Sequence, residues 1–156
     1  MVVTHLKDTY SSGNYKNCIK NNCKEKGARL KDIPRYDHLI LDGDEIEKCK
    51  KRCQPLPSCD CIILKNPYHG KILFVELRTG NCNLSKLIAK FTHSTEEILS
   101  VLEEVNSDSH SLHHVLLGSI GDSGLKKNPG FKIKGKYCFI DVKPSISSLK
   151  DIKKFH

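Results

Sequence analysis

Apolar residues recur along the chain in two patterns, short continuous runs and one long helical stripe. The runs at 61–64, 72–77, 114–118 and 137–142 are rich in Ile, Leu, Val and Phe, as is typical of buried strands. Between 83 and 105, apolar residues recur every three or four positions, which predicts one long helix with a single buried face. Together the patterns predict an α/β protein with a central mixed β-sheet flanked by helices.

Shorter elements precede and connect these runs. Residues 36–41 are strand-like, and a turn at Asp42-Gly43 follows them. Asp44 is suited to cap a helix over 44–53, because a short polar side chain can accept hydrogen bonds from the first turn. Turn residues at 66–70 separate the first two apolar runs and predict a β-hairpin.

The chain length limits the number of domains. At 156 residues the protein fits one domain that can bury a sizeable core. Residues 1–35 are polar, which predicts an N-terminal extension of irregular structure. Residues 121–156 supply a last strand followed by a basic helix at 145–155. No apolar run approaches the length of a membrane span and the start lacks the pattern of a signal peptide, so we expect a cytoplasmic protein without membrane partners.

The charge balance suggests a class of partner. Lys and Arg number 26 against 18 Asp and Glu, which gives a net charge of +8. A basic surface attracts phosphate backbones by releasing their condensed counterions, so nucleic acid is the first partner to expect. The alternative is a basic surface with no ligand, because net charge bears on association rather than on fold.

Two acidic residues and an arginine form the main candidate site. In a strand, Phe74, Glu76 and Arg78 share one face, so a carboxylate and a cation emerge side by side. Asp60 heads the preceding strand, which the hairpin lays alongside. Two such carboxylates can hold Mg²⁺ through oxygen ligands, and the arginine can position water or phosphate. The alternative is an exposed ion pair on a half-polar strand.

This arrangement resembles the D…ExK signature of the PD-(D/E)xK nucleases. Asp60 with the strand 61–64, the hairpin, and then Phe74 to Arg78 carry the resemblance. That superfamily includes restriction endonucleases and archaeal Holliday-junction resolvases. The resemblance covers residues 44–120 and implies a restriction-endonuclease-like αβββαβ core. It implies a metal-dependent nuclease that cleaves DNA or RNA with Mg²⁺ or Mn²⁺, and it allows a homodimer.

The resemblance also implies roles for individual residues. Asp60 and Glu76 take the places of metal ligands, and Arg78 takes the place of the signature lysine. The family's acidic residue on the first helix corresponds to Glu47 or, with less support, Glu45.

Two lysines on the long predicted helix are candidate phosphate ligands. Lys86 and Lys90 lie beside its apolar stripe, and Lys90 can reach a phosphate if the helix packs on the end of the sheet that carries the carboxylates. The alternative is a solvated helix face.

Arg78 is the main departure from the family pattern. A guanidinium is never deprotonated in practice and differs in shape from a lysine ammonium. A second hypothesis is therefore a nuclease fold that has lost catalysis and binds nucleic acid or a protein.

The cysteines support a third hypothesis, a cysteine-rich zinc-binding protein. Cys49, Cys53, Cys59 and Cys61 fall within thirteen residues, and four converging thiolates can bind zinc. Some nucleases of the superfamily also carry an iron–sulfur cluster, although the spacing here differs from theirs. Buried, inert cysteines and disulfides are the alternatives.

Overall fold

A seven-stranded mixed sheet forms the centre of the protein. The computed structural model describes residues 2–13, 15, 17–65, 70–105, 110–121 and 129–152. The strands of the central sheet are β1 (Ile19–Lys20), β4 (His38–Asp42), β5 (Cys61–Lys65), β6 (Lys71–Cys82), β7 (Ser111–Ile120), β8 (Gly130–Ile133) and β9 (Lys136–Lys143). They lie in the order β1-β4-β5-β6-β7-β9-β8.

The strand directions divide this sheet into two parts. β1, β4, β5 and β6 pair in antiparallel fashion, whereas β6, β7 and β9 are parallel neighbours. A parallel pair needs a crossover connection, and the helix α3 (Leu84–Glu103) supplies it between β6 and β7. The site described below lies where these two parts meet, on β5 and β6.

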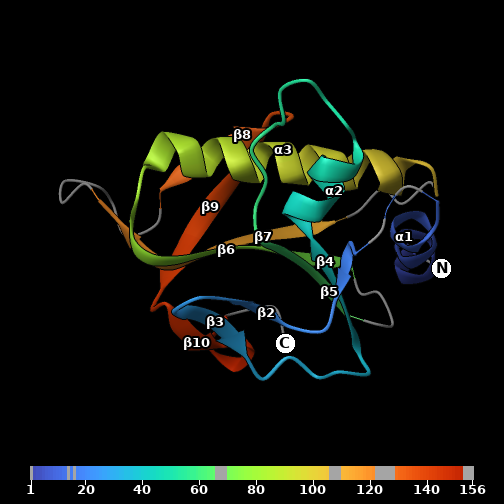
Figure 1. Cartoon of the computed structure of the whole chain (residues 1–156). Coiled ribbons are helices and arrows are strands. Elements are labelled where there is room, and N and C mark those ends of the chain that lie inside the picture. The colour runs from blue at the N-terminus through green and yellow to red at the C-terminus, as the bar shows by residue number, and fades with distance from the viewer. Residues whose placement is uncertain are drawn as a thin grey trace.

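Different structures cover the two faces of the sheet (Figure 1). The helices α1 (Val2–Ser11), α2 (Gly43–Cys49) and α3 all contribute to the apolar cluster on one face. On the other face lies a three-stranded sheet of β2 (Cys23–Glu25), β3 (Ala28–Lys31) and β10 (Ile146–Ser148), followed by the short 3₁₀ helix η1 (Leu149–Asp151). The expected α/β architecture with a mixed sheet is confirmed, but the second face carries a small sheet where helices were expected.

The central elements agree with the sequence patterns. β5 and β6 form the expected antiparallel pair, and α3 occupies nearly all of the helical stripe at 83–105. The strands β7 and β9 contain the two later apolar runs. The residues of the hairpin turn at 66–69 lie outside the described part of the chain.

The two ends of the chain differ from expectation. The polar segment at 1–35, expected to be irregular, forms α1 and three strands, and it buries Leu6, Tyr10 and Cys23 in the two cores. Residues 146–151, expected to be part of a helix, instead form β10 and η1. β10 pairs in parallel with β3, so the helical pattern was overridden by pairing between the two termini. Residues 153–156 lie outside the described structure.

The boundaries of α2 also differ from the expected ones. β4 continues through Asp42, whose side chain accepts a hydrogen bond from the Glu45 amide and caps the helix in place of Asp44. The helix ends at Cys49 rather than near Cys53. Within the described residues, no helix combines the length and the apolar character that crossing a membrane requires.

Candidate metal centre

The pairing of β5 with β6 sets the positions of Asp60 and Glu76. Asp60 directly precedes β5, and its amide donates a hydrogen bond of 3.0 Å to the carbonyl of Val75. Its carboxylate accepts a hydrogen bond of 2.7 Å from the amide of Leu77. Asp60 therefore contacts the residues on both sides of Glu76, and the two carboxyl groups come within hydrogen-bonding reach of each other.

Both carboxyl groups are largely removed from water. Glu76 is 1% exposed and Asp60 is 7% exposed. Burial raises the pKa of Asp60 to about 9, and the charge of Glu76 and a hydrogen bond with it act in the same direction. Without a cation, Asp60 therefore retains a proton at neutral pH. A bound cation would reverse this preference by stabilising the charged form.

Two basic side chains bind one oxygen of Glu76. Lys90 of α3 donates to Oε2 over 2.5 Å, and Arg78 donates through Nε at 3.1 Å. The second oxygen, Oε1, is buried and has no hydrogen-bond partner. An unpartnered buried carboxylate oxygen costs free energy and is where a ligand is expected.

Two further carboxylates lie close to Asp60. Ligand oxygens of Glu25, Asp44 and Asp60 are all within 4.8 Å of one another, close enough for a single ion to contact all three. Glu25 and Asp44 are exposed, unlike Asp60. Partial burial of the Asp44 carboxyl, and then the nearby charge of Asp42, raises its pKa. We call Glu25, Asp44, Asp60 and Glu76 the acidic cluster.

Two glycines let the surrounding segments approach this closely. A Cβ on Gly43 would lie 2.1 Å from the carbonyl oxygen of Cys59, so the start of α2 can approach the segment before β5 only with glycine there. Gly27, at φ +82°, turns the chain between β2 and β3, and a Cβ there would lie 2.3 Å from Thr79 Cγ2. These contacts bring Asp44 and Glu25 to the end of β6.

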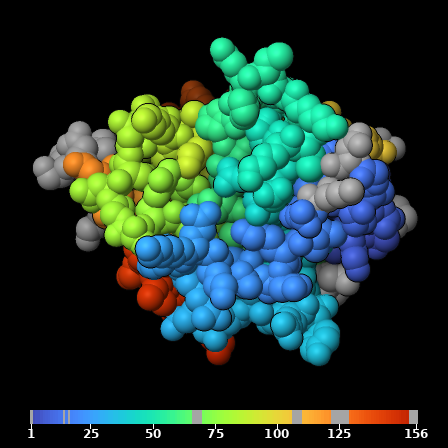
Figure 2. All heavy atoms as spheres, viewed as in Figure 1, coloured from blue at the N-terminus to red at the C-terminus, as the bar shows by residue number. Residues whose placement is uncertain are grey.

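The cluster opens on one face of the molecule. In Figure 2 the segment containing Glu25, the start of α2 and the first half of α3 meet on the face toward the viewer. Glu25 and Asp44 are exposed, whereas Glu76 is buried. An ion could therefore reach the exposed side of the cluster without passing through the core.

The donor set fits a hard divalent cation. Carboxylate oxygens are the ligands that Mg²⁺, Mn²⁺ and Ca²⁺ prefer, and no sulfur or imidazole belongs to the group formed by the described residues. The unpartnered Oε1 of Glu76 is available to a ligand, and a cation that bound Asp60 would displace the proton that its raised pKa retains.

The structure brings together some of the expected residues and separates others. Asp60, Glu76, Arg78 and Lys90 meet in one site. Lys86 is exposed on α3, and among the described residues its side chain makes no ion pair with the cluster.

The two glutamates expected from the first helix lie away from the cluster. Glu47 is buried and pairs with Arg52 at 2.8 Å and with His93 at 3.2 Å. Glu45 pairs with Lys48 at 3.1 Å. The helix contributes Asp44 instead, because β4 extends one residue further than expected, to Asp42, and Asp44 lies in the first helical turn beside Asp60.

The four clustered cysteines do not converge. Because α2 ends at Cys49, Cys53 leaves the helical face and is exposed. Cys59 is buried, and Cys61 forms a disulfide with Cys23. The expected zinc or iron–sulfur ligand set is therefore not assembled by these residues, and one of its members is already bonded elsewhere.

Glu25 and Asp44 were missed as candidate ligands. Asp44 was assigned to helix capping, a role that Asp42 fills. Glu25 lies in the segment expected to be irregular, which in the structure forms β2 and β3 joined by a turn at Lys26-Gly27. Neither residue belongs to a recognisable sequence motif. They come close to Asp60 only because segments that are distant in the chain pack together.

No protein-family model matches the sequence, and no curated protein and no solved structure matches the chain. The chemistry of the site is therefore inferred from its own residues.

Proposed function

We propose that the protein is a metal-dependent phosphodiesterase that cleaves DNA or RNA, with a restriction-endonuclease-like core of the PD-(D/E)xK type. The observation that carries the proposal is the buried contact between Asp60 and Glu76, with one Glu76 oxygen unpartnered and two cations on the other. Lys90 and Arg78 bind one oxygen of Glu76 and leave the other available to a ligand.

The order of elements supports this core. Three antiparallel strands, β4, β5 and β6, are followed by α3 and the parallel strand β7, which is the βββαβ part of the family order. The expectation over 44–120 took α2 as the first helix. In the structure α2 lies between β4 and β5, inside the βββ part, and α1 is separated from β4 by β1, β2 and β3.

The ion would be Mg²⁺ or Mn²⁺, held by Asp60 and Glu76 with Asp44 and Glu25 at the exposed side. Such an ion supplies Lewis-acid chemistry, lowering the pKa of an attacking water and compensating charge on the phosphate. Lys90 and Arg78 hold Glu76 in place and present two positive charges beside the reacting phosphate. Lys90 is placed to take the role expected of the signature lysine, since its ammonium can share its protons between Glu76 and a phosphate.

The test is cleavage of labelled single-stranded and double-stranded DNA and RNA with Mg²⁺ or Mn²⁺. We expect the wild type to cleave at least one substrate and Glu76→Ala to lose that activity. A matched control is Glu103→Ala, which removes an exposed carboxylate that pairs with Lys134. Chelation by EDTA should abolish cleavage. Equal activity of wild type and Glu76→Ala would reject the proposal.

A nuclease fold that binds without cleaving is the second candidate, and Arg78 is the observation that favours it. Its guanidinium contacts Glu76 at 3.0 Å and stays charged under all conditions, so it cannot pass a proton to or from a water. If the wild type binds nucleic acid without cleaving it, and Arg78→Lys introduces metal-dependent cleavage, this candidate replaces the first.

The cytoplasm remains the proposed location, and nucleic acid the proposed partner. The Cys23–Cys61 disulfide is compatible with that location in hyperthermophiles, whose intracellular proteins retain disulfides. Mass spectrometry of the alkylated protein, purified without reductant, reports whether the bond forms in the cell.

A further inference from the structure

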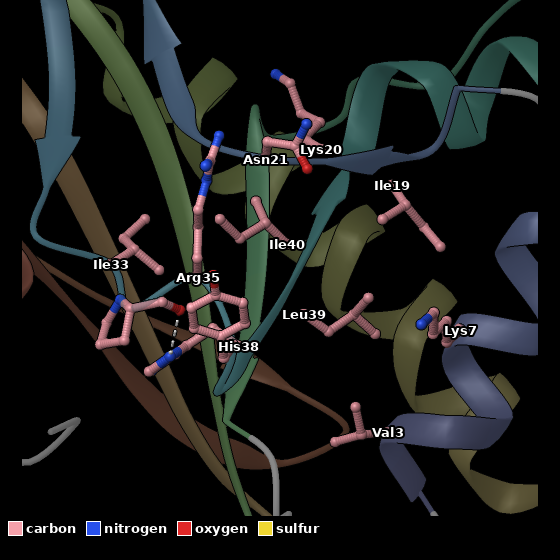
Figure 3. Close-up of a pocket in the computed structure, with 12 residues that line it drawn as sticks. Val3, Lys7, Ile19, Lys20, Asn21, Ile33, Arg35, His38, Leu39 and Ile40 are labelled. Carbon is pink, nitrogen blue, oxygen red and sulfur yellow. Dashed lines mark hydrogen bonds between the residues drawn. The ribbon is translucent and has the colours of Figure 1, made fainter.

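A second site candidate is a cavity at the β1 edge of the central sheet. It has a volume of about 260 Å³ and lies between α1, β1, β4 and the segment just before β4 (Figure 3). Ile19, Leu39 and Ile40 give it an apolar wall. The volume is of the order of a single small organic group, and the apolar wall favours a flat ring over an ion alone.

The charged residues that line this cavity are all basic. Lys7, Lys20 and Arg35 line it, and no Asp or Glu is among the described residues that do so. Lys20 is paired with Asp42 at 3.2 Å, whereas Lys7 and Arg35 form no ion pair within the described part of the chain. His38 is partly buried, which lowers its pKa, so it is neutral at pH 7. The cavity is therefore suited to an anion, and we call it the basic cavity.

An exposed aromatic ring stands beside these cations. Tyr36 is 94% exposed, the highest value among the large apolar side chains of the described residues. Leaving such a ring in water is unfavourable by roughly 25 cal/mol per Å² of apolar surface. A free aromatic face next to unpaired cations is the combination by which proteins bind single-stranded nucleic acid, because bases stack on the ring and phosphates contact the cations.

Two chain segments connect the basic cavity to the acidic cluster. Lys20 lines the cavity, and the same segment reaches Glu25 five residues later. Ile40 lines it as well, and Asp44 follows four residues later. At the rise of an extended strand, either path is on the order of 10 to 15 Å. A nucleic-acid strand therefore needs only a few nucleotides to reach from one site to the other.

We propose that the basic cavity binds one nucleotide of a single-stranded flank of the substrate, with its phosphate on Arg35 and its base on the neighbouring Tyr36, while Lys7 adds positive charge at the α1 side of the cavity. This inference rests on the proposed function, since it assigns the cavity to the same substrate. It adds that the substrate has a single-stranded portion, which nothing at the acidic cluster specifies.

The test measures binding without catalysis. A fluorescein-labelled single-stranded oligonucleotide is titrated with the full-length Glu76→Ala protein in EDTA. Each further substitution is made in this Glu76→Ala protein. We expect Arg35→Glu and Tyr36→Ala each to weaken binding about tenfold, and Tyr36→Phe to stay within about twofold, because stacking needs the ring and not the hydroxyl. Tyr137→Ala is the matched control, since Tyr137 is 63% exposed on β9, away from the cavity.

Comparing three ligands, a single-stranded oligonucleotide, a mononucleotide and duplex DNA, shows which kind of nucleic acid the cavity binds. A single-stranded oligonucleotide should bind more tightly than a mononucleotide, and both should lose affinity in Arg35→Glu. Duplex DNA should be affected least by Tyr36→Ala. Unchanged oligonucleotide binding in Arg35→Glu and Tyr36→Ala would overturn the inference, as would equal affinity for mononucleotide and oligonucleotide. Because metal is absent throughout, failure here leaves the cleavage test intact, and failure of cleavage leaves this result intact.

Discussion

The acidic cluster and the basic cavity lie at opposite ends of the same chain segments and differ in burial. In the cluster, Asp60 and Glu76 are almost fully buried and their charges are balanced by a proton and by two cations. In the cavity, Lys7, Arg35 and Tyr36 are exposed to solvent. The carboxyl groups of Asp60 and Glu76 are buried, whereas the charged groups of Lys7 and Arg35 are exposed to water.

The difference determines how each region responds to change. A buried charge interacts strongly with its neighbours, so removing or protonating one group alters the whole cluster. An exposed cation is screened by water and salt, so each contributes modestly and almost independently. We therefore expect large, coupled effects at the cluster and small, additive effects at the cavity.

The largest expected effect is that of Asp60→Asn, which should change activity and stability in opposite directions. Cleavage should fall roughly 1,000-fold, because a metal ligand worth several kcal/mol is lost. The folded-state pKa of about 9 lies above the unfolded value, so the unfolded state holds fewer protons and stability falls as pH rises toward 9. Asn removes this loss, and the free energy of unfolding without metal at pH 8 should increase by several kcal/mol. Urea unfolding measures it, and a destabilised variant would contradict the assigned protonation state.

Reduction of the Cys23–Cys61 disulfide should have the next largest effect. The bond joins β2, which carries Glu25, to β5, which follows Asp60, and closes a loop of 38 residues. Cys23→Ser should lower the free energy of unfolding by about 4 kcal/mol and weaken metal binding through the loosened Glu25 strand. Cys53→Ser changes an exposed thiol and serves as the control. Equal stability of the two variants would show that the bond does not form in solution.

Metal affinity should depend on pH through Asp60. A cation must displace the proton of this carboxyl, whose pKa is raised to about 9 by burial and by Glu76. Binding of Mn²⁺, followed by calorimetry, should therefore tighten as pH rises from 7, by up to about tenfold per pH unit while Asp60 remains protonated, and should level off once Asp60 is ionised. Oligonucleotide binding at the basic cavity should not rise over the same interval. An affinity for Mn²⁺ that is flat with pH would place the ion away from Asp60.

Lys90 and Lys86 on α3 allow a lysine that contacts the buried Glu76 to be compared with an exposed lysine on the same helix. Lys90→Met removes the ammonium that lies 2.5 Å from Glu76, and we expect a loss of about 30-fold in kcat. Lys86→Met, one helical turn earlier on the same helix, should change kcat by less than about threefold. Equal losses in both variants would assign their effect to general attraction of the substrate rather than to the site.

The smallest effect is expected at the basic cavity, in the salt dependence of binding. Arg35→Ala removes one phosphate contact, so the slope of log K against log salt should decrease by about 0.7 for a single strand. Affinity at low salt should fall several-fold, and that difference should shrink as salt is added. An unchanged slope would mean that Arg35 does not contact a phosphate.

Local patterns predicted the central strands and the long helix of the fold. The runs that became β5 and β6 are continuous and apolar because both of their faces are buried, and the stripe of α3 is regular because one face packs on the sheet. The patterns also placed Glu76 and Arg78 on one strand face and Asp60 beside them. These relations depend on neighbours in the chain and on one short hairpin.

The parts of the structure that these patterns did not predict depend on contacts between segments that are distant in the chain. Residues 2–31 appeared too polar to pack, yet they complete both cores because β2 and β3 pair with β10 from the other end of the chain. Glu47 seemed the natural acidic ligand, but capping by Asp42 rotates α2 so that Asp44 faces the cluster and Glu47 faces His93. No periodicity encodes such pairings.

By itself, the sequence determined the alternation of helices and strands and the placement of two carboxylates and an arginine at the end of a hairpin, since local propensity and side-chain periodicity act within a few residues. Only the tertiary structure decided that Glu25 and Asp44 join them, that Lys90 binds Glu76, and that Cys61 pairs with Cys23. The reason is that burial and charge compensation are properties of the assembled interior, which brings together groups that the chain order keeps apart.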